Sequence, residues 1–151
     1  MKPLIVLLAA FAVSCIVTFF IQKNPDYTWA GNIAMSAMLL FTSVGHFAFT
    51  KGMSMMLPRF IPFKTSWVYA TGVIEIIAAL GLLLPDLRYI TAICLMTFFL
   101  TIIPANIHAA LQKVDYQKGG SNGPGPKYLW FRIPLQIFFI LWIWYFGIKL
   151  P

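Results

Sequence analysis

The sequence predicts an all-α, polytopic membrane protein: a bundle of transmembrane helices without an aqueous domain. Of its 151 residues, 60% are hydrophobic and only 10% are charged, whereas a soluble domain carries roughly 25% charged residues because its surface must be solvated. The apolar residues also gather in runs of about 20, the length that crosses the ~30 Å hydrocarbon core. These two observations exclude a soluble globule and a disordered chain. The two cysteines can form at most one disulfide, which is too few for a disulfide-stabilised secreted domain.

Five apolar runs are predicted to span the membrane, and they leave only short connectors. The runs cover residues 3–21, 28–50, 67–84, 89–111 and 128–148. Tyrosine and tryptophan residues lie near the run ends, where an amphipathic ring is best accommodated at the membrane interface. No internal repeat is evident. Residues 1–151 are therefore expected to form a single integral membrane domain.

The connectors between the runs differ in character. Residues 85–88, Pro-Asp-Leu-Arg, read as a tight turn, whereas the glycines and prolines of residues 112–127 predict a flexible loop. Residues 51–66 interleave methionine, leucine and phenylalanine with three cations, and two prolines prevent one continuous helix. We expect this connector to lie along the membrane surface or to fold back as a cover.

The distribution of lysine and arginine predicts the orientation. The net charge of +7 would indicate nucleic acid in a soluble protein, but in an apolar chain it indicates charge that fixes topology beside a bilayer. Cations on alternate sides number seven against three: Lys2, Lys51, Arg59, Lys64, Lys113, Lys118 and Lys127 against Lys23, Arg88 and Lys149. Positive short loops stay cytoplasmic. The N-terminus is thus expected in the cytoplasm and the C-terminus outside.

The first run has a second interpretation as a cleaved signal peptide, because Ala12-Val13-Ser14-Cys15 resembles a lipoprotein cleavage box. The apolar run continues past Cys15 to Ile21, which is long enough to span. A retained helix is the favoured interpretation.

Six polar side chains inside the runs are the candidates for function, since each costs about 2.5–3.5 kcal/mol on insertion scales. They are His46, Glu75, Asn106, His108, Arg132 and Gln136. At ~1.5 Å per residue all lie in the half of the membrane that the orientation makes the inner one. Four separate runs contribute them, which predicts one buried polar cluster.

Within this cluster Arg132 is the expected partner of Glu75, since a guanidinium stays charged and binds a carboxylate through two hydrogen bonds. Gln136 follows Arg132 by four residues and shares its helical face. Asn106 and His108 lie about 200° apart around a helix, so Asn106 is the stronger candidate unless Pro104 distorts that turn. We take His46, Glu75, Asn106, Arg132 and Gln136 as candidate ligand-binding residues.

Plainer explanations stand beside these candidates. The Glu75, Arg132 and Gln136 side chains could be polar glue that locks the helices together, and His46 could be a capping or snorkelling residue near the interface. Cys15 and Cys94 form no Cys-x-x-Cys pair. No spacing of histidines and carboxylates favours a metal site, and no nucleic-acid motif is present.

The motifs from residue 45 onward resemble the DoxX-like family of small membrane proteins, over about residues 29–145. The motifs are Gly45-His46-Phe47, Leu57-Pro58, Phe60-Ile61-Pro62, Thr71 to Glu75, Gly81 to Pro85, Ile103 to His108 and Arg132 to Gln136. The resemblance implies a four-helix DoxX-like core made by the last four runs, with residues 3–21 as an added helix, in a bacterial inner (plasma) membrane. The histidine, glutamate and Pro-Ala-Asn positions of the DoxX-like family match His46, Glu75 and residues 104–106 of this sequence.

Two functions of different kinds follow. In the first, the chain is a redox-associated accessory protein that binds a quinone or lipid, with a quinone as the candidate cofactor and the polar cluster holding its headgroup. In the second, it is a non-enzymatic membrane chaperone or assembly protein, whose polar cluster is structural and whose small residues Ala30, Ala34 and Ala37 allow close helix approach. Expected partners are membrane lipid and either a membrane protein or a second copy of the chain. Catalysis through Glu75 and His46 is a third, more demanding hypothesis.

Overall fold

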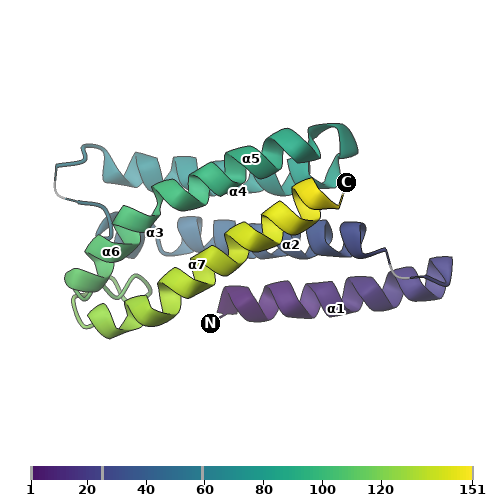
Figure 1. Ribbon diagram of the computed structural model, residues 1–151. Helices are drawn as coiled ribbons and strands as arrows, with labels where there is room; N and C mark the ends of the chain where they lie inside the picture. Colours follow the sequence, from purple (N-terminus) through teal and green to yellow (C-terminus); the bar gives the residue numbers. More distant parts are fainter. Residues whose placement is uncertain (1, 25, 59, 151) are drawn as a thin grey trace.

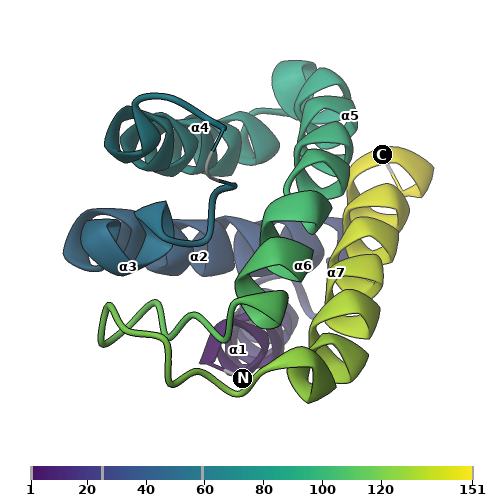
Figure 2. The same ribbon diagram turned by 90° about the vertical axis from the view of Figure 1, so that its left-hand side faces the viewer.

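The computed structural model describes residues 2–24, 26–58 and 60–150, and within these ranges the chain is a bundle of roughly antiparallel helices (Figure 1). α2 lies in the middle of the bundle, packed between α1 and α4, while α5, α6 and α7 close the other side (Figure 2). The two long connectors lie at one end. The α4–α5 turn and the C-terminus lie at the other end (Figure 1).

The elements follow the predicted runs closely, with two interruptions. The bounds in chain order are α1 Lys2–Gln22, α2 Tyr27–Ala48, α3 Thr50–Ser54, α4 Lys64–Leu83, α5 Pro85–Thr101, α6 Ile103–Leu111, the 3-10 turn η1 Pro126–Tyr128, α7 Leu129–Trp144 and the π turn η2 Tyr145–Lys149. The second run breaks at Phe49 and the fourth at Ile102. The described residues contain no β-strand, so the all-α class is confirmed for them.

Within the described residues, four stretches of helix are long and apolar enough to cross a membrane. They are Lys2–Ile21, Lys64–Leu83, Pro85–Leu111 and Pro126–Lys149. α2 is not among them, because polar side chains such as Asn32, Ser36 and His46 interrupt its apolar residues. Five spans are therefore not confirmed, although each predicted run is helical.

The helix starts follow local chemistry. The side chain of Asp26 accepts a hydrogen bond from the Trp29 amide at 2.9 Å, which caps the N-terminus of α2. The tight turn predicted over residues 85–88 is wrong: the turn is at Leu84, and Pro85 is already in the first turn of α5. Proline lacks an amide hydrogen that the first turn would leave unpaired anyway, and Asp86 there complements the helix dipole.

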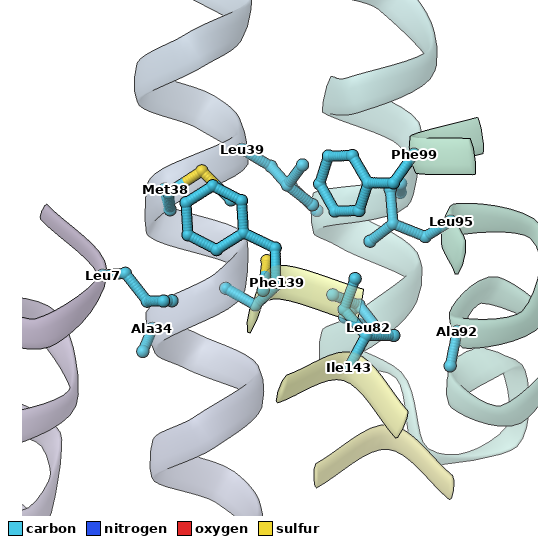
Figure 3. Close-up of a cluster of buried hydrophobic side chains, with 13 residues drawn as sticks. Leu7, Ala34, Met38, Leu39, Leu82, Ala92, Leu95, Phe99, Phe139 and Ile143 are labelled. Carbon is cyan, nitrogen blue, oxygen red and sulfur yellow. The ribbon is translucent and has the colours of Figure 1, made fainter. Parts of the chain in front are cut away.

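The hydrophobic core is built where all five long helices meet (Figure 3). Leu7 of α1 is fully buried against α2, and Leu39, Leu82, Leu95 and Ile143 join it from the other four helices. Phe99 and Phe139 pack with ring centroids 6.0 Å apart. Ala30 and Ala34, suggested above as docking positions for a partner, are fully buried within the chain's own bundle.

The two long connectors, residues 51–66 and 112–127, contact each other at their end of the bundle. We call this the basic end, because the connectors carry Lys51, Lys64, Lys113, Lys118 and Lys127. A Cβ at Gly52 in α3 would overlap the backbone carbonyl of Tyr116, so only glycine permits this approach. The loop of residues 112–125 is tied by backbone hydrogen bonds, among them Asp115 N to Gly120 O at 2.7 Å and Gly123 N to Lys113 O at 2.6 Å. It is a folded turn with its own hydrogen bonds, which the expectation of a flexible loop did not include.

The first connector covers this end only in part. Met56 is buried against the bundle, but Phe60 and Phe63 are more than 80% exposed. Arg59, one of the seven cations counted above, lies outside the described residues.

Candidate functional site

Two ionisable side chains, His46 of α2 and Glu75 of α4, are in contact. Their Nε2 and Oε1 atoms lie 3.5 Å apart, and this is the one contact between a basic and an acidic side chain found among residues 2–24, 26–58 and 60–150. Glu75 is 5% exposed. A Cβ at Gly72 would come within 2.9 Å of the His46 Cβ, so the missing side chain lets α2 and α4 approach here.

Two threonine hydroxyls complete this group. Thr42 Oγ1 lies 2.9 Å from Glu75 Oε2 and 3.0 Å from the Leu39 carbonyl. On the other side of the pair, Thr71 Oγ1 lies 3.0 Å from His46 Nδ1 and 2.9 Å from the Val68 carbonyl, which is 3.2 Å from the same ring nitrogen. We call Thr42, His46, Thr71 and Glu75 the His–Glu network.

The His–Glu network can change its number of protons without losing a hydrogen-bonding partner. With an imidazolium and a carboxylate, Nδ1–H donates to the Val68 carbonyl, Nε2–H faces Glu75, and both hydroxyls donate, to Glu75 and to the Val68 carbonyl. If the Nδ1 proton leaves, the Thr71 hydroxyl rotates and donates to Nδ1 instead. Because each proton count leaves every side chain partnered, the arrangement suits proton exchange.

The pairing expected between Glu75 and Arg132 is wrong. Glu75 contacts His46 and Thr42, whereas the guanidinium carbon of Arg132 lies 6.0 Å and 5.9 Å from the ring centroids of Tyr116 and Tyr128. Residue spacing gives the depth of a side chain along its helix but not the direction in which the helix face points. Arg132 faces the loop that folds over the start of α7.

Asn106 and Gln136 form a second polar pair, between α6 and α7. Asn106 Nδ2 donates to Gln136 Oε1 at 3.0 Å, and Gln136 Nε2 donates to the carbonyl of Phe99 in the last turn of α5. Both side chains are at least 92% buried. The helix is interrupted at Ile102, just before Pro104, and the pair supports the backbone at that break.

The interruption also explains how His108 and Asn106 both find partners on different sides. His108 Nδ1 lies 3.0 Å from the carbonyl of Met56, so it holds the first connector onto α6. The five candidate residues are thus brought together as two pairs, and Arg132 stands apart from both. No hydrogen bond or ion pair in the described structure joins the pairs.

Sequence reasoning missed Thr42 and Thr71. Each precedes its charged neighbour by four residues, Thr42 before His46 and Thr71 before Glu75, so each hydroxyl shares a helical face with that neighbour. That repeated spacing was the available signal. It also missed Asn32, whose Nδ2 donates 2.8 Å and 2.9 Å bonds to the carbonyls of Thr28 and Phe146 and so ties η2 to α2.

Two cavities of about 410 Å³ each border these elements. The first lies at the basic end, between α6, the loop of residues 112–125 and Arg132. The second is an almost wholly apolar groove between α4 and α5, and it includes Ile74, Ala78 and Phe98. The described residues contain no group of three or more His, Cys, Asp or Glu side chains that could hold a metal ion.

Comparison with known proteins gives a family but no activity. No curated protein and no solved structure matches this sequence. A family described as a domain of unknown function (DUF8561) matches residues 35–147, from the middle of α2 to η2, and leaves out α1. That match covers most of the sequence, so the chain belongs to this family.

Proposed function

We propose that this chain is an integral membrane protein that binds a quinone and exchanges a proton with its headgroup at the His–Glu network, as an accessory to a membrane redox system. The observation that carries the proposal is the network itself, which keeps its partners with one proton more or one fewer. Reduction of a quinone consumes protons at its two oxygens, so a site that gives and regains a proton suits that chemistry.

The apolar groove between α4 and α5 supports the same function. Ala78 belongs to the groove and lies one helical turn from Glu75, and the wall continues through Ile74 and Phe98. A groove of this kind fits the isoprenoid tail of a quinone, while the His46 side chain, 18% exposed, is the accessible member of the pair. The resemblance to DoxX-like proteins, which include a subunit of thiosulfate:quinone oxidoreductase, points in the same direction.

The proposal includes α2 as a fifth span. α2 packs along α1 and α4, and both of these are long and apolar enough to cross a membrane. If α1 and α4 span the membrane, α2 between them lies at the same depth, and its polar side chains are satisfied by the bundle rather than by water. Ser36, for example, donates to the Ala79 carbonyl at 2.8 Å.

The proposed setting is a bacterial inner membrane with the basic end in the cytoplasm, following the excess of lysine and arginine there. Labelling intact cells with a membrane-impermeant maleimide tests this. In a chain with Cys15 and Cys94 replaced by serine, Lys149→Cys should react and Lys118→Cys should not. Reaction of Lys118→Cys alone would show that the chain has the opposite orientation.

A direct test of the function compares quinone binding by purified wild type, Glu75→Gln and His46→Gln with binding by His108→Gln. His108 is the matched control because it bonds the Met56 carbonyl and not the network. A short-chain ubiquinone analogue, titrated into each protein in detergent, should bind wild type and His108→Gln alike. The two network variants should bind at least about tenfold more weakly, since a charge-assisted hydrogen bond is worth about 1.5–3 kcal/mol. Equal affinity for all four proteins would refute the proposal.

A second candidate, a membrane chaperone or assembly protein, is favoured by one observation: every buried side-chain nitrogen and oxygen in the described residues has a hydrogen-bonding partner. Polar pairs that are fully satisfied need no ligand and can simply lock the bundle. Under this alternative, Glu75→Gln and His46→Gln lower the amount of folded protein in the membrane. Under the quinone proposal, folded protein is retained and binding is lost. A stoichiometric protein partner after mild purification would favour the assembly function.

A further inference from the structure

The cavity at the basic end is lined by the cationic side chain of Arg132, which has no anionic partner in the described residues. Arg132 is half-buried on its wall, and no hydrogen bond or ion pair to its side chain is found within residues 2–24, 26–58 and 60–150. The rings of Tyr116 and Tyr128 lie near the guanidinium, at 6.0 Å and 5.9 Å from its carbon. The rings restrict the guanidinium but accept none of its five N–H donors.

The other charges that line the cavity leave an excess of positive charge. Lys2, at the start of α1, adds a second cation to the lining. Among the described residues, Asp115 is the only acid that lines the cavity, and its Oδ1 already accepts hydrogen bonds from the backbone amides of Gln117 and Lys118, both at 3.1 Å. The cavity therefore has two cations against one carboxylate, of which Oδ1 is already hydrogen-bonded, and the guanidinium donors of Arg132 are unused.

The position and volume of the cavity limit the classes of ligand that it can bind. The cavity lies where Pro85–Leu111 ends and Pro126–Lys149 begins, which is the level of the lipid headgroups if these helices span. Its volume of about 410 Å³ lies within the range of roughly 300–1,000 Å³ typical of small-molecule sites. That is room for more than a bare ion, and basic pockets between helices at a membrane surface suit phosphate headgroups.

We infer that this cavity is a binding site for a phosphate group, with Arg132 as its principal ligand and Lys2 as a second cation. The guanidinium binds two phosphate oxygens in its plane. The tyrosine rings hold that plane in place, and the folded loop of residues 112–125 forms one wall of the site. The phosphate belongs either to an anionic phospholipid or to a small soluble phosphate compound.

The test uses the purified full chain in a neutral detergent, with three probes: dihexanoyl phosphatidylglycerol, glycerol 3-phosphate and inorganic phosphate. Isothermal titration compares wild type with Arg132→Gln and with Lys149→Gln. Lys149 is the matched control, because its Nζ also lies over two aromatic rings, 5.5 Å from Trp144 and from Tyr145, but at the opposite end of the bundle. Wild type and Lys149→Gln should bind a probe equally, and Arg132→Gln should bind it at least about tenfold more weakly.

The three probes identify the source of the phosphate. Binding of the phosphatidylglycerol alone assigns a lipid, and binding of glycerol 3-phosphate or inorganic phosphate assigns a soluble compound. If Arg132→Gln does not fold, Lys2→Gln should still weaken binding several-fold, and wild-type affinity should fall as salt rises. The inference is overturned if wild type binds no probe, or if neither the Arg132 nor the Lys2 variant weakens binding relative to Lys149→Gln. Quinone binding at the His–Glu network is independent of this outcome.

Discussion

Replacing Gly72 with alanine tests whether close approach of α2 and α4 builds the His–Glu network. The new Cβ would lie 2.9 Å from the His46 Cβ and 3.3 Å from two ring atoms of Phe47, whereas ordinary contact begins at 3.4 Å. The two helices must therefore separate locally by about 0.5 Å, the difference between 2.9 and 3.4 Å. Overpacking of this kind costs about 1–3 kcal/mol.

Gly45→Ala is the matched control, because its Cβ would lie 3.5 Å from the flexible end of Met53 and 4.0 Å from a ring atom of Phe49, both ordinary contact distances. Both changes gain helix propensity of up to about 1 kcal/mol, so that gain largely cancels in the comparison. Unfolding in mixed detergent, followed by circular dichroism, should show Gly72→Ala less stable than Gly45→Ala by about 1–3 kcal/mol. The same variant should also bind the quinone analogue more weakly, since His46 and Glu75 move apart. Equal stability of the two variants would show that the helices are not in close contact here.

Three further changes test the parts of the structure that support the sites. Asn106→Leu or Gln136→Leu alone should lower the free energy of unfolding by about 1–3 kcal/mol, because each leaves a buried amide unpaired, while the double variant should lose less than the sum. Gly52→Ala should displace the loop at the basic end and accelerate its cleavage by protease, whereas Gly120→Ala, whose Cβ meets nothing within 4 Å, should leave the cleavage rate unchanged. Thr71→Val should lower stability by about 1 kcal/mol and weaken quinone binding, because the hydroxyl that pairs with the deprotonated ring nitrogen is lost.

Each of these three predictions would be contradicted by a specific result. Strictly additive effects at Asn106 and Gln136 would mean that the two amides do not contact each other. Equal cleavage of the Gly52 and Gly120 variants would remove the packing of the loop on α3. Thr97→Val provides the control for Thr71, because its hydroxyl bonds only the Ile93 carbonyl of its own helix. Indistinguishable quinone binding by the two threonine variants would separate Thr71 from the network.

The helices could be predicted from the sequence because their signals are local. Each apolar run became helix within a few residues of its predicted ends, and the break near Pro104 follows from the missing amide hydrogen of proline. The start of α5 was misplaced because Pro85 was interpreted as a turn residue, although proline serves equally well in the first turn of a helix. The local signal was present in that case, and it had two interpretations.

The candidate site was predicted only in part, because side-chain partners depend on how each helix is rotated about its axis. Depth estimates placed His46 and Glu75 only in the same half of the membrane, and the two side chains are in contact. The prediction that Arg132 pairs with Glu75 rested on charge. In the structure Arg132 instead faces Tyr116, in a loop whose fold cannot be predicted from residue spacing. Local periodicity could have added Thr42 and Thr71, since each shares a helical face with a residue already selected.

The central claim is that His46 gives up and regains the proton on its Nδ1 atom while its Nε2 atom stays beside Glu75, so the Glu75 carboxyl group senses the charge of His46. Infrared difference spectroscopy of the purified protein across a pH titration tests it most directly, with the Glu75 carboxyl band identified by its loss in Glu75→Gln. The account predicts that this band changes with pH, and that His46→Gln alters the change while His108→Gln does not. A Glu75 band that responds identically in wild type and in His46→Gln would contradict the claim.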